Sequence, residues 1–208
     1  MHTKNLQYGC GLSAPKDWIN YDASPMIILQ KIPIVGKKIQ KIRKVKFPDN
    51  VKYGNIVKGF PKYINSCNAI FCSHVLEHLS YEEFKIAIRN SFQLLKDNGI
   101  FRIVIPDLER LCKNYLLDEN NPDRSINFMK NSGLGVEKRR KFIDKVKGVF
   151  GNSQHLWLWD YKSIEKKLKE TGFKNIRLCE YNDSEIKDFE SVENIDRFKG
   201  SIAIEAKK

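Results

Sequence analysis

Apolar and polar positions alternate along the chain in two patterns, which predict strands and helices in turn. Apolar runs at 4–8 and 19–22 predict two short buried strands near the N-terminus. The run NAIFCSH, residues 68–74, is almost continuously apolar and predicts a strand buried on both faces, as in a parallel sheet. The run IFRIVIP, residues 100–106, predicts another strand that ends at its proline.

Between and after these runs, apolar residues recur every three or four positions and predict helices. The clearest helix follows Ser80, which forms a capping-box pattern with Glu83, and we expect it to end at Gly99. A second helix, YKSIEKKLKET, is predicted between Asp160 as its N-cap and Gly172. Two strands, FKNIRLCEY and GSIAIEAK, are expected after it. Strands that alternate with helices predict an α/β fold with a doubly wound sheet.

Two segments depart from this alternation. Residues 24–48 mix isoleucines with lysines and are broken by Pro33 and Gly36, which predicts a helical turn, a bend and a basic amphipathic insertion. Residues 113–155 are polar with weak helical patterns, and we interpret them as a lid or acceptor-side insertion. Since the chain has 208 residues and no internal repeat, residues 1–208 are expected to form a single domain.

Composition and cysteine spacing favour a cytoplasmic protein. No apolar run approaches the roughly 18 residues of a membrane helix, and the first residues lack the apolar stretch of a signal peptide. The five cysteines are scattered without a Cys-x-x-Cys pair, so we expect reduced thiols.

The formal net charge of +12 fits an acidic partner such as nucleic acid, a phosphate-bearing substrate or anionic lipid. The basic stretch 31–46 lacks aromatic residues for base stacking, so nucleic acid is not expected as a partner. Its isoleucines fit a peripheral contact with a membrane or a lipid-linked substrate. They fit equally well a solvated face whose apolar residues pack on the sheet.

Candidate ligand-binding residues stand where the predicted parallel strands end, which is where open α/β sheets bind ligands. The first strand is followed by Gly9 and Gly11, the second ends at Asp22, and the strand 68–74 ends at Ser73 and His74. Glycines allow close backbone approach to a ligand, and an aspartate at this place can bind ribose hydroxyls. Only eleven residues separate Gly11 from Asp22, too few for a full helical crossover. A dinucleotide-dependent oxidoreductase is therefore disfavoured.

Several segments together resemble the class I S-adenosylmethionine-dependent methyltransferases. They are LQYGCG, WINYD, VKYGNIVKGFP, the block from NAIFCSHVLEHL to VIPDLERL, and GNSQHLWLWDYKSIEKKLKETGF. The most specific element is Val-Leu-Glu-His-Leu followed by Leu-Leu-Lys-x-x-Gly. The resemblance is to compact bacterial, methyltransferase type 11-like members, often found near surface-polysaccharide genes. It implies a Rossmann-like, mostly parallel sheet with a shortened first crossover and an insertion before the last helix.

The resemblance also implies S-adenosylmethionine as the cofactor and a set of residues that bind it. The set comprises Gly9, Cys10, Gly11, Asp22, Asn55, Ile56, Ser73 and His74. The glycine loop would wrap the methionine part, Asp22 would bind the ribose, and Asn55 with Ile56 would flank the adenine. Ser73 and His74 would lie near the sulfonium and its methyl group.

The sequence departs from the family pattern at three places where acids are frequent. They hold amides instead: Gln7, Asn55 and Asn68. These amides lower the negative charge around a cationic cofactor, although Asn55 can still bond adenine through its amide. They leave open the alternative that the chain is a non-catalytic binding or scaffolding protein with a methyltransferase fold.

Two histidines are candidate catalytic bases. Methyl transfer is an in-line displacement that depends on alignment, but a hydroxyl or amine acceptor must also lose a proton. His74 fits either a base or a residue that shapes the cofactor pocket. His155 stands beside Trp157 and Trp159, which form either an aromatic wall for an acceptor or part of the core.

The segment HVLEH, residues 74–78, also matches the His-x-x-Glu-His motif of one class of zinc proteases. That zinc site needs both histidines on one helical face, whereas His74 is predicted to end a strand, so no metal site is expected. The resemblance to class I methyltransferases implies methyl transfer to a small-molecule or glycan-type acceptor, at an oxygen atom, in surface-polysaccharide biosynthesis.

Overall fold

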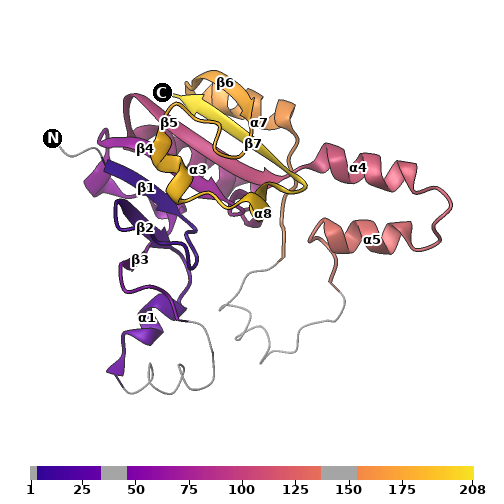
Figure 1. Ribbon diagram of the computed structural model, residues 1–208, viewed down its shortest axis with the longest axis horizontal. Coiled ribbons are helices and arrows are strands. Elements are labelled where there is room, and N and C mark those ends of the chain that lie inside the picture. The colour runs from indigo at the N-terminus through magenta and orange to yellow at the C-terminus, as the bar shows by residue number, and fades with distance from the viewer. Residues whose placement is uncertain (1–3, 34–45, 137–153) are drawn as a thin grey trace.

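The structure is a computed structural model that describes residues 4–33, 46–136 and 154–208. The described residues form a seven-stranded sheet in the order β3-β2-β1-β4-β5-β7-β6 (Figure 1). All neighbouring strands are parallel except β7, which runs antiparallel to β5 and β6. The strands are β1 Lys4–Tyr8, β2 Trp18–Asp22, β3 Val51–Tyr53, β4 Cys67–Ser73, β5 Leu95–Pro106, β6 Lys174–Cys179 and β7 Ser201–Lys207. The predicted doubly wound α/β sheet is confirmed.

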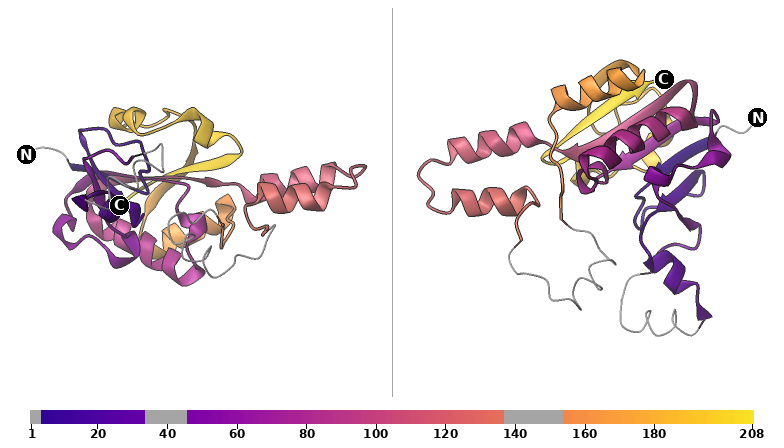
Figure 2. Two further views of the ribbon diagram at one scale, coloured as in Figure 1. Left: turned by 90° about the horizontal axis from the view of Figure 1, so that it is seen from below. Right: turned by 180° about the vertical axis from the view of Figure 1, so that it is seen from behind.

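Helices and helical turns cover both faces of this sheet. The α-helices are α1 Met26–Gln30, α3 Tyr81–Leu94, α4 Leu108–Leu117, α5 Arg124–Asn131, α7 Tyr161–Thr171 and α8 Ile195–Phe198. The 3₁₀ turns are η1 Ile56–Lys58, η2 Pro61–Tyr63, η3 Leu76–His78 and η4 Lys187–Ser191. Helices α3 and α7 pack on one face, while η4 and the chain leading to α8 pack on the other (Figure 2).

Strand β4 shows why the sequences of the central strands are almost continuously apolar. Because side chains alternate between faces of a strand, Ile70 and Cys72 pack in the core beneath α3, and Ala69 and Phe71 pack in the core beneath η4. All four are buried. The prediction of a strand buried on both faces is confirmed.

Helix α3 begins as predicted but ends earlier. The Ser80 hydroxyl accepts the Glu83 N–H, and the Glu83 carboxylate accepts the Ser80 N–H at 3.0 Å, which completes the capping box. The predicted end at Gly99 is wrong, because β5 starts at Leu95 and pairs there with Cys67 of β4. Pairing with the sheet overrides the helix-ending signal of the Lys-Asp-Asn-Gly sequence.

Helix α7 follows its prediction at both ends. The Asp160 carboxylate accepts the Ser163 N–H at 2.7 Å, and Gly172 ends the helix in the left-handed conformation with φ of +111°.

The connection between β1 and β2 contains no helix, although parallel strands usually need a helical crossover. Side-chain amides hold this loop, residues 9–17, in place. Gln7 donates to the Ser13 carbonyl at 2.8 Å, Asn20 donates to the Pro15 carbonyl at 2.9 Å, and Asn50 donates to the Ala14 carbonyl at 2.9 Å. An acid at position 7 lacks the N–H that this contact needs, which gives a structural reason for the amide there.

The two predicted insertions lie at different places on the sheet. In the segment 24–48, α1 is followed by residues outside the described ranges, and the Gln30 side chain bonds the backbone of Phe47 through both its oxygen and its nitrogen. The segment 113–155 begins within α4, which forms with α5 a hairpin that projects away from the sheet (Figure 1), and residues 137–153 are not described.

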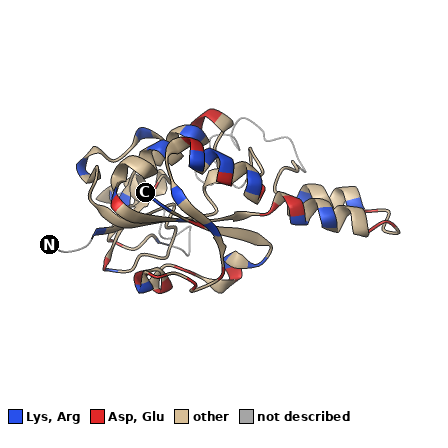
Figure 3. Cartoon of the chain, turned by 90° about the horizontal axis from the view of Figure 1, so that it is seen from above, with Lys and Arg blue, Asp and Glu red and all other residues tan. Residues whose placement is uncertain are grey.

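Basic residues of the described helices are largely interspersed with acidic ones along the chain (Figure 3). Ion pairs join Lys169 to Glu165 at 2.9 Å and Lys167 to Glu170 at 2.8 Å on α7, and Lys113 to Glu109 at 2.6 Å on α4. Most of the basic segment 31–46 lies outside the described residues. Among the described residues, no helix combines the length and apolar character needed to cross a membrane.

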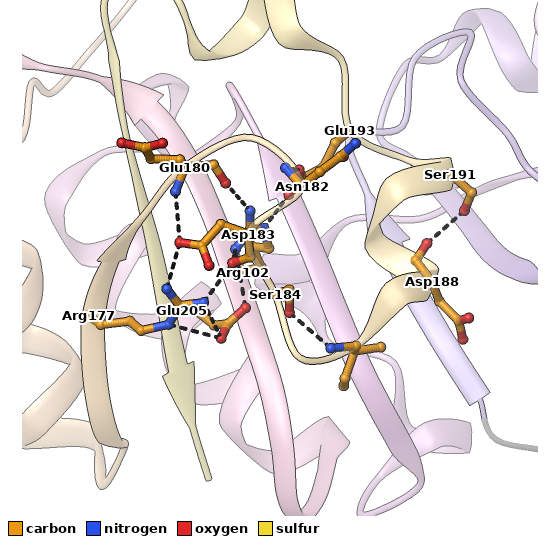
Figure 4. Close-up of polar contacts among 11 residues, drawn as sticks. Arg102, Arg177, Glu180, Asn182, Asp183, Ser184, Asp188, Ser191, Glu193 and Glu205 are labelled. Carbon is orange, nitrogen blue, oxygen red and sulfur yellow. Dashed lines mark hydrogen bonds and ion pairs between the residues drawn. The ribbon is translucent and has the colours of Figure 1, made fainter.

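A buried arginine joins β5 to the chain that covers the second face of the sheet (Figure 4). The side chain of Arg102 is 0% exposed and forms ion pairs with Glu193 and Glu205. Its guanidinium also donates to the carbonyls of Asp183 at 2.9 Å and Glu180 at 2.5 Å. Arg102 thus contacts two acids and two carbonyls, and Glu205 is also paired with Arg177 at 3.1 Å.

Candidate functional site

A cavity of about 700 Å³, here called the main cavity, opens at the C-terminal ends of the parallel strands. Predicted site residues from four strand ends line it: Gly9, Asp22, Asn55, Ile56 and His74. A smaller glycine-side cavity of about 180 Å³ is lined by the remaining predicted cofactor residues, Cys10, Gly11 and Ser73, and also by Gly9. The structure thus places all eight predicted cofactor residues around two cavities that share Gly9.

Gly9 has a steric reason to be glycine. Its φ is +68°, and a Cβ atom at this position would lie 2.1 Å from Cγ2 of Val75, the residue that follows His74. The missing side chain lets the end of β1 pack directly against the chain leaving β4. Gly11 has a similar φ of +55°, but a Cβ there would meet nothing within 4 Å. The two glycines of the Gly-Cys-Gly turn therefore serve different needs.

This difference predicts unequal effects of two substitutions. We expect Gly9→Ala to lower the free energy of unfolding by about 2–4 kcal/mol, since the unfavourable φ and overpacking each cost about 1–3 kcal/mol. The matched control Gly11→Ala retains only the φ cost of about 1 kcal/mol. Urea denaturation of both variants measures the difference, and equal losses would show that contact with Val75 does not constrain Gly9.

Asp22 connects the loop that follows β1 to the loop that follows β2, beside the main cavity. Its carboxylate accepts the Gly11 N–H at 2.9 Å through Oδ2 and the Ser24 N–H at 2.8 Å through Oδ1. A carboxylate has about four acceptor sites, so each oxygen retains capacity for a ligand hydroxyl. Burial, and secondarily the charge of Asp22, raises the pKa of Cys10 to about 12, so this thiol stays neutral.

The far wall of the main cavity is formed after β3. The Asn55 side-chain oxygen accepts the Val57 N–H at 2.8 Å and caps η1, so its amide nitrogen is the part left for a ligand. Ile56 is buried next to it. Behind this wall, the rings of Tyr21 and Phe60 stack with their centroids 4.2 Å apart.

His74 stands between the main cavity and a third one. It has a positive φ of +52°, and its Nε2 lies 2.9 Å from the Arg197 carbonyl oxygen. A carbonyl only accepts, so Nε2 carries the proton. The other nitrogen, Nδ1, lies 3.3 Å from Oε1 of Glu77.

His155 lies in the third cavity rather than in the main one. This hairpin-side cavity, about 410 Å³, is lined by both His74 and His155 and by residues of α4, including Arg110 and Asn114. His155 Nδ1 lies 2.6 Å from the Ser132 carbonyl oxygen, just after α5. The two predicted catalytic histidines therefore meet in one cavity at the base of the α4–α5 hairpin.

The two tryptophans near His155 have different environments. Trp159 is 3% exposed and stacks on Phe84 with ring centroids 3.8 Å apart, so it belongs to the core. Trp157 is 43% exposed and contacts Tyr81 with ring centroids 5.0 Å apart. The sequence left open whether the tryptophans belong to the core or form a wall for an acceptor. Trp159 belongs to the core, whereas the exposed ring of Trp157 is accessible to an acceptor.

Two site residues were missed or underrated by the sequence analysis. Arg197 of α8 lines the glycine-side cavity and donates to the Ser73 carbonyl at 2.8 Å. No sequence motif marks it, because α8 reaches this site only through the fold. Glu77 is the second, and its backbone carbonyl accepts the N–H groups of Leu156 and Trp157. Its side chain, however, also faces three histidines.

Comparison with known proteins places this arrangement among methyltransferases. A family described as "Methyltransferase domain" matches residues 8–178. A SAM-dependent methyltransferase from Archaeoglobus fulgidus is similar in structure, with a TM-score of 0.51 and 15% identity over 99% of this chain and 86% of that chain. A SAM-dependent methyltransferase from Thermotoga maritima, described as a possible histamine N-methyltransferase, gives a TM-score of 0.53 and 14% identity. The match covers 99% of this chain and 82% of that chain.

Some other structural matches are much longer than this chain. The CMeT domain of citrinin polyketide synthase gives a TM-score of 0.50 and 13% identity, with 98% of this chain but only 46% of that chain covered. The chain thus spans about half the length of that domain. No curated protein sequence matches the chain.

Proposed function

Because the chain belongs to the methyltransferase domain family, we propose that it transfers a methyl group from S-adenosylmethionine to a hydroxyl oxygen of a small-molecule or glycan-type acceptor. The family match confirms the predicted class of protein and the expectation of an enzyme, and the strand order agrees with the predicted fold. The observation that supports the proposal most is the main cavity, where four strand ends bring together a carboxylate, an amide and a glycine turn.

The residues around the main cavity fit S-adenosylmethionine by their chemistry. Free acceptor capacity on Asp22 suits the two ribose hydroxyls, and the free amide nitrogen of Asn55 suits a ring nitrogen of adenine. A volume of about 700 Å³ lies within the usual range for ligand pockets, about 300–1,000 Å³. We assign Asp22 to the ribose, and Asn55 with Ile56 to the adenine.

The glycine-side cavity fits the methionine end of the cofactor. Gly9, Cys10 and Gly11 form one wall, and Arg197 supplies a guanidinium on the other. A guanidinium is the side chain best suited to a carboxylate. We assign Arg197 to the methionine carboxylate, and Ser73 to holding Arg197 through its hydroxyl at 3.2 Å and its carbonyl at 2.8 Å.

S-adenosylmethionine, when bound, supplies a methyl group on a positively charged sulfur. The chain's part is to align the acceptor and to take up the hydroxyl proton. We assign both tasks to the hairpin-side cavity, where His74 and His155 each have one ring nitrogen at a carbonyl and the other facing Glu77. The segment 113–155 then forms the acceptor side of the site.

His155 provides a test of this division between cofactor and acceptor. We expect His155→Ala to reduce turnover by about 100-fold or more, the lower range for loss of a proton-transferring group. Its affinity for S-adenosylmethionine should stay within about 2-fold, because His155 does not line the main cavity. Steady-state kinetics and calorimetry measure the two quantities, and full activity in the variant would remove His155 from the catalytic machinery.

The acceptor class can be tested by methyl transfer from labelled S-adenosylmethionine to a panel of nucleotide sugars and glycans. The proposal predicts a product methylated at oxygen. Transfer only to amines would contradict the choice of acceptor atom. Cofactor binding without transfer to any class of acceptor would favour the alternative, a non-catalytic protein with a methyltransferase fold.

We further propose that the protein acts in the cytoplasm in surface-polysaccharide biosynthesis, and that segment 24–48 contacts a membrane or a lipid-linked substrate. The exposed apolar residues Ile28 and Ile32, with Lys31 between them, support this contact, since such a mixture suits a membrane surface. The five cysteines are all free thiols, as expected of a reducing compartment.

A further inference from the structure

Three histidines surround the buried carboxylate of Glu77 where β4 leads into α3. Oε1 of Glu77 lies 3.3 Å from Nδ1 of His74, 3.9 Å from Nε2 of His155 and 4.0 Å from Nε2 of His78. Possible ligand atoms of Glu77, His78 and His155 all lie within 4.8 Å of one another. His155 arrives from the far end of the hairpin insertion, so the fold rather than the local sequence builds this group.

The described residues offer no hydrogen-bond partner that would explain why the Glu77 carboxylate is buried. It is 0% exposed, and within the described part of the chain neither of its oxygens has a hydrogen-bond partner. A buried carboxylate without a partner is strongly disfavoured, and such groups in proteins are paired or coordinate metals. The carboxylate therefore points to a cation among the histidines.

The hydrogen bonds of the histidines orient two ring nitrogens toward the same point. His78 Nδ1 lies 3.0 Å from the Gln154 carbonyl oxygen, and His155 Nδ1 lies 2.6 Å from the Ser132 carbonyl oxygen. Since a carbonyl only accepts, each Nδ1 carries a proton, and in the neutral ring the lone pair is on Nε2. Metal-binding histidines almost always donate their other ring N–H in this way.

We propose that the Glu77 carboxylate and the Nε2 atoms of His78 and His155 bind a divalent cation of the zinc class. Two imidazoles and one carboxylate suit zinc and its transition-metal neighbours better than magnesium or calcium, which prefer oxygen ligands. In a tetrahedral zinc site with bonds of about 2.1 Å, ligand atoms lie about 3.4 Å apart. The distances from Glu77 Oε1 to the two nitrogens, 3.9 and 4.0 Å, lie about half an ångström above that spacing, and all three ligand atoms lie within 4.8 Å of one another.

This proposal departs from the sequence-based expectation that no metal binds. That expectation considered His74 and His78 as ligands on one helical face. The structure replaces His74 by His155 as the second imidazole and keeps Glu77 and His78 at the turn η3. Gly133 supports this geometry, because a Cβ there would lie 2.5 Å from Nδ1 of His155.

The ion would have open coordination positions at the junction of two cavities. His78 lines the main cavity and His155 lines the hairpin-side cavity. Three protein ligands leave room for a water molecule or an oxygen of the acceptor, as in catalytic zinc sites. The ion could bind an acceptor oxygen and favour its deprotonation, and this role rests on the proposed methyl transfer. The assignment of the three ligands does not depend on that function. His155 would then act on the acceptor through the ion.

Cobalt(II) titration of the metal-free, untagged full-length protein tests the ligand set directly. We expect a saturable visible absorption at one equivalent, displaced by zinc but not by millimolar magnesium. Glu77→Gln and His155→Ala should each weaken cobalt binding by more than about 100-fold, because even residues behind the ligands commonly affect metal affinity by about 10- to 100-fold. The control Glu82→Gln removes an exposed carboxylate paired with Lys85 and should bind normally.

Circular dichroism of the metal-free variants separates loss of binding from loss of fold. His155→Ala should disturb the fold less than Glu77→Gln, because the His155 side chain is 15% exposed and the Glu77 side chain is 0% exposed. Azide, a small ligand for open positions, should shift the spectrum of the cobalt-loaded protein. Absence of a saturable signal, or undiminished binding in folded Glu77→Gln and His155→Ala, would overturn the site, and no response to azide would overturn the open positions. No cofactor is used, so failure here is distinct from failure of the proposed methyl transfer.

Discussion

Replacement of Asp22 by alanine is expected to weaken S-adenosylmethionine binding by at least about 100-fold without unfolding the protein. The two hydrogen bonds assigned to the ribose hydroxyls involve a charged acceptor, and each such bond contributes about 1.5–3 kcal/mol. A loss of about 3 kcal/mol corresponds to roughly 100-fold in affinity. Calorimetric titration of the wild type and the variant measures the change.

Asp17→Ala is the matched control, because Asp17 is an exposed acid in the loop just before β2 and does not line the main cavity. Its affinity should equal that of the wild type. The Gly11 and Ser24 N–H groups lose their acceptor in Asp22→Ala, so thermal denaturation must show that the variant stays folded. Normal cofactor affinity in a folded Asp22→Ala protein would refute the assignment to the ribose.

Replacement of Arg102 by methionine should lower the free energy of unfolding by about 3–5 kcal/mol. Methionine fills much of the buried volume but leaves Glu193 and Glu205 without their shared cation, and loss of one member of a buried ion pair has about this cost. The carbonyls of Glu180 and Asp183 also lose a donor. Urea denaturation measures the loss.

Arg177→Met is the control for this prediction. Arg177 pairs with Asp183 at 2.7 Å and with Glu205 at 3.1 Å, but its side chain is 40% exposed. Ion pairs that are open to solvent contribute at most about 1 kcal/mol, so the control should lose little stability. Similar small losses in both variants would mean that the buried acids find other partners and that Arg102 does not hold the covering chain to β5.

Features that depend on neighbouring residues could be predicted from the sequence. The capping box at Ser80 and the glycine that ends α7 act within one turn of a helix, so local sequence determines them. The short spacing from Gly11 to Asp22 excluded a full helical crossover, and the structure has only a loop there. The predicted end of α3 was wrong, because the pairing of Leu95 with Cys67 is a contact between distant parts of the chain.

The candidate site was predicted in part for the same reason. Strand ends of a parallel sheet meet at one edge, so Gly9, Asp22 and His74 could be placed together before the structure was known. Arg197 could not, because it reaches Ser73 across 124 positions of sequence. The approach of His155 to Glu77 likewise depends on how the base of the hairpin folds back, which no periodicity in the sequence records.

The central claim is that this chain binds S-adenosylmethionine at the strand ends. Calorimetric titration of the full-length protein with S-adenosylmethionine and with S-adenosylhomocysteine tests it most directly. The structure predicts saturable binding of both with micromolar dissociation constants, on the order of −8 kcal/mol. Absence of saturable binding for either compound would contradict the claim.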